Sequence, residues 1–167
     1  MKKRLSLMFL LLLLIDIASK YYVFHFIPKM GLSTPVYPYG GIPIFKGVLN
    51  GVDFSIVNIE NLGAAWGIFS AYSDYLLWAR IFIVIGLVGY LFFGKLDRSK
   101  KITVLLIMTG AMGNILDFFF YGHVVDMFYF KFWSFSYPIF NVADSLITIG
   151  IIFLFIFSNQ YKSKKYA

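Results

Sequence analysis

The sequence predicts an all-α integral membrane protein, a single domain of four transmembrane helices with a small extramembrane, β-containing outer loop. Three observations predict this fold. Hydrophobic residues make up 60% of the 167 residues and charged residues only 14%, whereas soluble domains carry about 25% charged residues. Four apolar segments approach the roughly 20 residues that a helix needs to span hydrocarbon. Most Lys and Arg residues gather in three clusters beside these segments.

The expected spans are residues 5–27, 75–93, 102–121 and 142–157, of which the last is short. The basic clusters lie before the first span, between the second and third, and after the fourth: Lys2, Lys3 and Arg4; Lys95, Arg98, Lys100 and Lys101; Lys162, Lys164 and Lys165. Because Lys and Arg accumulate in cytoplasmic loops, both termini are expected in the cytoplasm. The outer loops are then residues 28–74 and 122–141. Clusters in these places attract anionic lipid head groups, so the net charge of +7 does not indicate nucleic acid.

The first basic cluster and residues 5–15 also resemble a cleavable signal peptide. Against that alternative, apolar sequence resumes after Asp16 and continues to Ile27. Cleavage would also leave an odd number of spans. We therefore expect the first apolar segment to be a helix of the folded protein.

The first outer loop is not expected to form a long helix, because it holds four of the five prolines and several glycines. Apolar and polar residues partly alternate from Asp53 to Glu60, which predicts a short, half-buried strand. The chain has no cysteine, which excludes a disulfide, a thiol nucleophile and a thiolate metal site.

Several polar residues are expected to converge on one layer in the outer half of the membrane. At ~1.5 Å per helical residue, Asp16 lies about 16 Å beyond Leu5, and Asp117 about 22 Å beyond Ile102. Asp126 follows the third span, and Asp144 begins the fourth. The layer comprises Asp16, Lys20, Asn114, Asp117, Asp126, Asn141 and Asp144. Carboxylates near hydrocarbon are costly and often functional.

Asp126 and Asp144 allow two interpretations. In the structural one, Asp144 is an N-terminal helix residue stabilised by the helix dipole, and Asp126 is a loop carboxylate. In the functional one, two nearby carboxylates share a proton, so that one activates water while the other protonates a leaving amine. We favour the functional interpretation.

The other polar residues also have structural alternatives. Gly110, Gly113, Asn114 and Asp117 share one helix face, which favours close helix packing through the glycines. Asp16 and Lys20 could form an i, i+4 pair with Lys20 reaching outward to water. His123 is expected to be a solvated loop residue, because it forms no recognisable ligand motif with His25 or the carboxylates. We therefore expect no metal and no cofactor.

In five motifs, the chain resembles the lipoprotein signal peptidases (signal peptidase II), membrane aspartic proteases of bacteria. Residues 16–20 (Asp-Ile-Ala-Ser-Lys) resemble the family's Asp-x-x-Ser/Thr-Lys, and residues 61–67 (Asn-Leu-Gly-Ala-Ala-Trp-Gly) its Asn-x-Gly-Ala-Ala-Trp/Phe. Residues 110–117 (Gly-Ala-Met-Gly-Asn-Ile-Leu-Asp) are similar to its Gly-Ala-Leu-Gly-Asn-x-x-Asp. Residues 124–126 (Val-Val-Asp) and 140–145 (Phe-Asn-Val-Ala-Asp-Ser) resemble its two catalytic boxes.

The resemblance implies removal of the signal peptide from a prolipoprotein on the amino side of a cysteine modified with diacylglycerol. It implies that Asp126 and Asp144 are the catalytic dyad. It further implies that other site residues position substrate or dyad (Asn61, Gly63, Asn114 and Asn141) or support the site (Asp16, Lys20 and Asp117). The outer loop would supply a small sheet and a lid. We expect a monomer in the bacterial inner membrane, in contact with lipids and with its active site at the outer face.

One position departs from the family pattern, which usually has Arg directly after the third-span Asp; this chain has Phe118 there. Among the basic residues outside the clusters, we expect Lys131 to replace that Arg and Arg80 to be the least suitable. The competing functional class is a small membrane transporter or structural protein that uses Asp16 and Asp117 for protons. That class does not explain residues 61–67 or a dyad outside the membrane.

Overall fold

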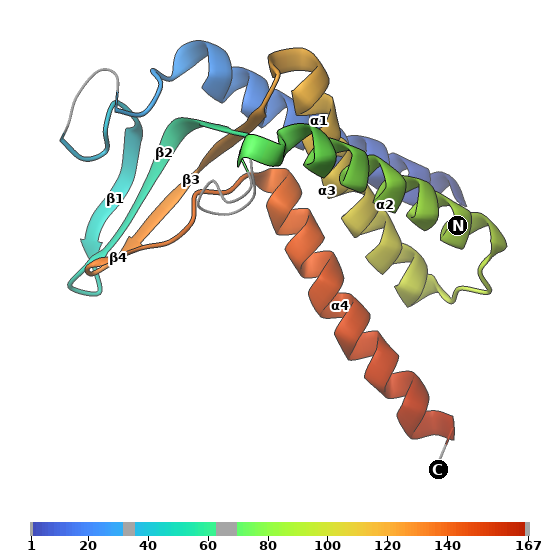
Figure 1. Ribbon diagram of the computed structural model, residues 1–167. Helices are drawn as coiled ribbons and strands as arrows, with labels where there is room; N and C mark the ends of the chain where they lie inside the picture. The colour runs from blue at the N-terminus through green and yellow to red at the C-terminus, as the bar shows by residue number, and fades with distance from the viewer. Residues whose placement is uncertain (1, 32–35, 63–69, 166–167) are drawn as a thin grey trace.

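The structure is a computed structural model and describes residues 2–31, 36–62 and 70–165. Four helices and a four-stranded antiparallel sheet make up this part of the chain (Figure 1). The helices are α1 (Lys2–Phe26), α2 (Ser73–Phe93), α3 (Arg98–Tyr121) and α4 (Val142–Lys165), with a short 3₁₀ helix η2 (Ser70–Tyr72) before α2. The strands are β1 (Ile42–Val48), β2 (Val52–Asn61), β3 (Val124–Phe132) and β4 (Phe135–Ser136).

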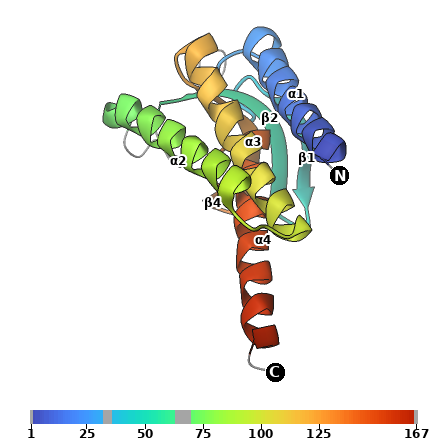
Figure 2. The same ribbon diagram turned by 90° about the vertical axis from the view of Figure 1, so that its right-hand side faces the viewer.

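Helix α3 is the centre of the helical part, because it packs against α1, α2 and α4. Figure 2 shows α3 between α1 and α2, and α4 leaving the group at an angle. The N-terminus, the connection between α2 and α3 and the C-terminus lie away from the sheet (Figure 1). This arrangement agrees with basic clusters on one side of a membrane and the sheet on the other.

Three helices of the described chain are long and apolar enough to cross a membrane: Lys3–Phe26, Ser73–Phe93 and Arg98–Tyr121. They coincide with three of the expected spans, beginning two to four residues earlier, and the first ends one residue earlier. The apolar part of α4, Val142–Phe157, is shorter, so the fourth span stays a prediction. Helix α2 exposes large apolar side chains such as Trp78 and Phe82, as expected of a surface that contacts lipid.

The glycines of α3 allow the close helix packing that the sequence predicts. A methyl group at Gly110 would overlap the backbone carbonyl of Ala143 in α4, and one at Gly113 would overlap the Asp16 carboxylate of α1. Helices α1, α3 and α4 therefore meet at the depth of the polar layer. Residues of α1 thus contact both α3 and α4.

The sheet differs from the prediction because it draws on both outer loops. Strand β2 confirms the strand expected within residues 53–60 and is slightly longer. Strand β3, in the second outer loop, was not predicted, and it pairs with β2 from Asn61↔Val124 to Val52↔Phe132. The first half of β3 is buried on both faces, so its sequence is a nearly continuous apolar run without alternation. Asp126 is consequently a strand residue and not a loop carboxylate.

Candidate active site

The carboxylates of Asp126 and Asp144 come from different elements that backbone hydrogen bonds bring together. Asp126 lies in β3 opposite Ile59 of β2, and Asp144 lies in the first turn of α4. The amides of Met127 and Phe128 both donate to the carbonyl of Phe140, at 3.1 and 2.8 Å. This contact places the start of α4 beside β3, and with it the two carboxylates in one site.

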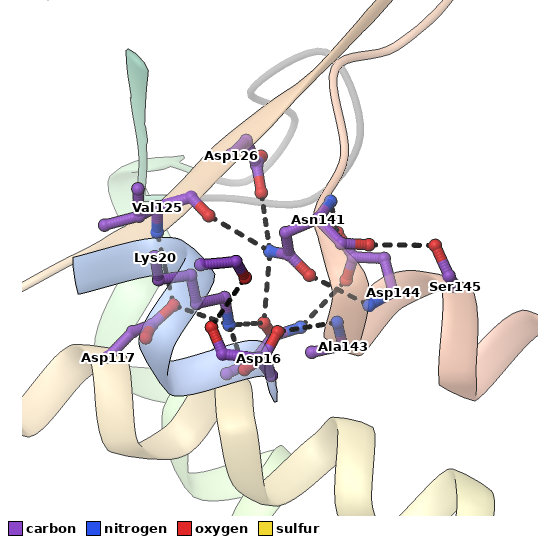
Figure 3. Close-up of polar contacts among 11 residues, drawn as sticks. Asp16, Lys20, Asp117, Val125, Asp126, Asn141, Ala143, Asp144 and Ser145 are labelled. Atoms are coloured by element: carbon purple, nitrogen blue, oxygen red, sulfur yellow. Dashed lines mark hydrogen bonds and ion pairs between the residues drawn. The ribbon is translucent and has the colours of Figure 1, made fainter. Parts of the chain in front are cut away.

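Asn141 joins the two carboxylates directly (Figure 3). Its Nδ2 donates to Oδ1 of Asp126 at 2.8 Å, and its Oδ1 accepts from the backbone amide of Asp144 at 2.9 Å. The backbone amide of Asn141 donates in turn to Oδ2 of Asp144 at 3.3 Å. These reciprocal bonds form a capping box at the start of α4.

Two further side-chain amides bond the other oxygen of each carboxylate. Asn61 Nδ2 donates to Oδ2 of Asp126 at 2.7 Å, and Asn114 Nδ2 donates to Oδ1 of Asp144 at 2.8 Å. We call Asp126, Asp144 and the three asparagines Asn61, Asn114 and Asn141 the amide-linked pair. Neutral amides fix the positions of both carboxylates without supplying a counter-charge.

A second pair of carboxylates, Asp16 and Asp117, lies next to the first (Figure 3). An ammonium group holds this pair together. Lys20 Nζ lies 2.8 Å from Oδ2 of Asp16 and 2.8 Å from Oδ2 of Asp117, and it donates to Oδ1 of Asn114 at 2.9 Å. The three donors of the ammonium are thereby used. We call Asp16, Lys20 and Asp117 the lysine-centred cluster.

The lysine-centred cluster also holds the backbone beside each member of the amide-linked pair. Asp117 Oδ2 accepts from the amide of Val125 at 3.2 Å, and Asp16 Oδ1 accepts from the amide of Ala143 at 2.8 Å. These two residues directly precede Asp126 and Asp144. The cluster therefore positions the strand and the helix that carry the pair.

Burial gives Asp126 unusual acid–base properties. Its side chain is almost inaccessible to solvent, and burial, followed by repulsion from Asp144, raises the pKa of Asp126 to about 7. The hydrogen bonds from Asn61 and Asn141 act in the opposite direction. Asp126 can therefore hold a proton at neutral pH, while the N-terminus of α4 favours negative charge at Asp144.

Two cavities open beside the amide-linked pair. The larger, of about 570 Å³, is lined by Asp144 and Asn114 together with mostly apolar residues such as Ile147. The smaller, of about 340 Å³, is lined by Asp126 and Glu60. Asn61 and the segment 137–139 border both cavities. An extended ligand that crosses this border would pass between the carboxylates.

The structure brings together the site residues that the sequence predicts, except Gly63, which lies outside the described residues. The assembled residues are Asp16, Lys20, Asn61, Asn114, Asp117, Asp126, Asn141 and Asp144. The alternative in which Lys20 reaches outward to water is wrong. Its side chain is fully buried, because two helices supply partners for the ammonium that a single helix cannot.

The prediction of a solvated His123 is also wrong. The imidazole is buried, with its Nε2 3.5 Å from Oε1 of Glu60 and its ring close to the rings of Phe24 and Tyr121. Burial lowers the pKa of His123, so the residue is neutral at pH 7. Within the described chain, no three His, Asp or Glu side chains are arranged to hold a metal ion.

Arg80 is a residue at the site that the sequence analysis undervalued. It lines the larger cavity with Asp144 and Asn114, and its guanidinium carbon lies 5.6 Å from the centre of the Phe118 ring. Lys131, the expected substitute for the missing Arg, is a β3 residue opposite Ser136 and is not among the residues lining the two cavities. The sequence feature that could have identified Arg80 as a site residue is its position as a single arginine inside an apolar span.

Comparison with known proteins agrees with this geometry. Residues 8–160 match the family model Peptidase_A8, signal peptidase (SPase) II. The chain is 41% identical over 117 residues to a lipoprotein signal peptidase of Chlamydia pneumoniae, covering 67% of this chain and 70% of the relative. It is 34% identical over 124 residues to a lipoprotein signal peptidase of Chlamydia trachomatis serovar L2, covering 73% of this chain and 74% of the relative.

The fold is similar to that of a bacterial membrane enzyme solved by the in meso method. The TM-score is 0.77 with 30% sequence identity, over 98% of this chain and 92% of that one. The bacterial relatives and the apolar helices fit a multi-pass protein of the bacterial inner membrane. The motifs, the fold and the match over most of its length show that this chain belongs to the signal peptidase II family.

Proposed function

We propose that this chain is an aspartic endopeptidase that removes signal peptides from diacylglyceryl-modified prolipoproteins, on the amino side of the lipid-modified cysteine. The observation that carries the proposal is the amide-linked pair, in which Asn141 bonds both Asp126 and Asp144. The substrate class is inferred from the named relatives, which are lipoprotein signal peptidases. Asp126 and Asp144 are the proposed catalytic residues.

The acid–base roles follow from the surroundings of each carboxylate. Asp126, with a pKa of about 7, supplies the proton, and Asp144 at the N-terminus of α4 is the base. Asp144 takes a proton from water while the water oxygen bonds to the scissile carbonyl carbon. Asp126 then protonates the nitrogen as the C–N bond breaks. The pair still holds one proton afterwards, so it can act again.

The other polar residues would then support the reaction without taking protons. Asn61, Asn114 and Asn141 orient the carboxylates through the hydrogen bonds described above. Gly63 is carried as a substrate-contacting residue from the family motif alone. Asp16, Lys20 and Asp117 hold the backbone beside the dyad. This assignment also disfavours a proton-carrying transporter, because Asp16 and Asp117 are both ion-paired with Lys20.

We further propose that both termini lie in the cytoplasm and that the dyad acts at the outer face, in a monomer with four spans. The basic clusters beside the helices support this orientation. The chain has no cysteine, so single cysteines at Gly40 and Ser134 can be labelled selectively. Labelling by an impermeant reagent from outside is expected at both positions, and protection of either would overturn the orientation.

The activity is tested by incubating the purified protein with a diacylglyceryl-modified prolipoprotein and following the shift to the mature form on a gel. The unmodified prolipoprotein is the substrate control and is expected to remain uncleaved. The matched protein control is His123→Ala, a buried change near the dyad that removes no bond to it; this variant is expected to stay active, and chelators are expected not to inhibit. Absence of cleavage by the wild-type chain would refute the proposal.

A further inference from the structure

We infer that Arg80 binds a carbonyl oxygen of the substrate in the larger cavity and so helps to fix the lipopeptide against Asp144. The inference rests on the proposed function and assigns a binding role to a residue of α2, a helix that supplies no member of the amide-linked pair. The inference is based on the observation that Arg80 lines this cavity.

Arg80 belongs to α2 but faces the amide-linked pair. It lines the larger cavity together with Asn114 and Asp144, and its guanidinium lies over the ring of Phe118 in α3. The Phe118 ring is close enough to the guanidinium for a cation–π contact.

The rest of α2 indicates that this position is unusual. Arg80 is the only basic residue between Ser73 and Phe93, and at ~1.5 Å per residue it lies about 10 Å along the helix from Ser73. Its neighbours Trp78 and Phe82 are 59% and 67% exposed, as for a lipid-facing surface, whereas Arg80 is half-buried. A charged side chain within an apolar span is costly, and it is usually retained for a specific partner.

The chemistry of the cavity favours a neutral acceptor. A guanidinium offers only donors, in a planar fork. A phosphate bound there would lie near the carboxylates of Asp144 and Asp126, and like charges repel in a site of low polarity. A carbonyl oxygen accepts the same hydrogen bonds without adding charge. A lipopeptide has two sources of such oxygens: the peptide backbone near the scissile bond and the ester groups of its acyl chains.

A purely structural role for Arg80 predicts a different outcome. If the guanidinium serves only the contacts of Arg80 within the protein, its removal should lower the melting temperature and leave the affinity for lipopeptide unchanged. If it binds substrate, the affinity should fall in variants that remain folded. Arg80→Met keeps an apolar stem against the Phe118 ring, and Arg80→Lys keeps the charge but loses the fork.

The experiment measures the Kd of a fluorescent diacylglyceryl lipopeptide for the full chain carrying Asp126→Asn, which prevents cleavage. We expect Arg80→Met to raise the Kd about 10- to 100-fold, the loss of one charge-assisted hydrogen bond, and Arg80→Lys to raise it by a smaller factor. Lys131→Ala, which removes a cation from β3, is the matched control and is expected to leave the Kd unchanged. Melting temperatures identify the folded variants.

The two carbonyl sources are distinguished with an ether-linked dialkyl lipopeptide, which lacks the ester carbonyls. If the ratio of Kd values between Arg80→Met and its parent falls to one on this ligand, the contact is an ester carbonyl. If the ratio persists, the contact is a peptide carbonyl. Either result supports the inference.

A Kd for Arg80→Met within twofold of its parent would overturn the inference, as would an equal loss in Lys131→Ala. If Arg80→Met does not fold, a Kd for Arg80→Lys within twofold of the parent would overturn it. If the wild-type chain cleaves the prolipoprotein but the Kd does not depend on Arg80, only this inference is rejected. A parent variant that does not bind the lipopeptide at all, together with an inactive wild type, rejects the proposed function as well.

Discussion

The site contains two pairs of aspartates that differ in what lies between their carboxylates. In the lysine-centred cluster, the ammonium of Lys20 lies 2.8 Å from an oxygen of both Asp16 and Asp117. In the amide-linked pair, the side-chain amide of Asn141 donates to the carboxylate of Asp126, and the backbone amide of Asn141 donates to that of Asp144. Three of these four aspartates are almost completely buried, Asp144 being the exception. The groups that contact the carboxylates therefore distinguish an ion-paired pair from the pair that we propose to be catalytic.

The difference is one of charge compensation. A carboxylate ion-paired with an ammonium has a counter-charge beside it and can hold backbone amides, as Asp16 and Asp117 do with Ala143 and Val125. A buried carboxylate held by amides keeps the cost of its charge, and so it retains a proton to higher pH. The raised pKa of Asp126 is the expression of this cost.

Asn114 connects the two pairs. Its Oδ1 accepts from Lys20 and its Nδ2 donates to Asp144, so the ammonium fixes which end of the amide faces the reactive carboxylate. The lysine-centred cluster thus orients Asp144 through the neutral amide of Asn114.

The largest effect is expected from removing either reactive carboxylate. Asp126→Asn or Asp144→Asn should lower kcat by at least about 10²–10⁴-fold, the usual contribution of general acid–base catalysis, because an amide cannot exchange a proton with water or the leaving amine. Cleavage rates of the purified variants test this, with circular dichroism as the folding control. Either variant with near wild-type turnover would remove that residue from the dyad.

The next effect should be on stability and should come from the lysine-centred cluster. Lys20→Met leaves two buried carboxylates without their counter-charge, and we expect a loss of about 3–5 kcal/mol in the free energy of unfolding. Denaturant unfolding in detergent measures it, with the exposed Lys46→Met as control. Adding Asp16→Asn and Asp117→Asn should recover part of the loss. A Lys20→Met protein as stable as the Lys46→Met control would show that the cluster is not a structural unit.

A smaller loss is expected where the helices approach each other around the cluster. Gly113→Ala introduces a methyl group that overlaps the Asp16 carboxylate, and overpacking of this kind costs about 1–3 kcal/mol. Gly86→Ala in α2 is the matched control, because a methyl group there has no heavy atom within 4 Å. Equal stabilities of the two variants would mean that α1 can move away from α3 at little cost.

The smallest effect is the contribution of Asp126 to the pH dependence of stability. Since its folded-state pKa of about 7 lies above the ordinary aspartate value of 3.8, the stability linked to its proton is full below about pH 4 and is lost as the pH rises through 7. The melting temperature of Asp126→Asn minus that of the wild type should therefore increase between pH 5.5 and 8.5. A difference that is constant or decreases across this range would contradict the sign of the shift.

Much of this architecture could be predicted from the sequence, because the signals are local. Long apolar runs and basic clusters predicted three helices that the structure confirms, and the depth argument placed Asp16 and Asp117 in one layer. The i, i+3, i+4, i+7 spacing from Gly110 to Asp117 also predicted the packed face of α3. Each of these patterns depends on residues within a single helix.

What could not be predicted depends on neighbours from elsewhere in the chain. Lys20 looked like a residue that reaches water, because its partners Asp117 and Asn114 are more than ninety residues away along the chain. Strand β3 lacked alternation because both faces of its first half are covered. His123 and Arg80 are placed by contacts with Glu60 and Phe118, which no spacing within one element reveals.

The most direct test of the difference between the two pairs is infrared spectroscopy of the protonated carboxyl group as a function of pH. We expect a protonated-carboxyl band at pH 5.5 that disappears as the pH rises through about 7 and is missing from Asp126→Asn. The band should persist in Asp16→Asn and Asp117→Asn variants that remain folded. A band that is absent from the wild type, or that disappears with Asp16 or Asp117 instead of Asp126, would show that the proton is not held by the amide-linked pair.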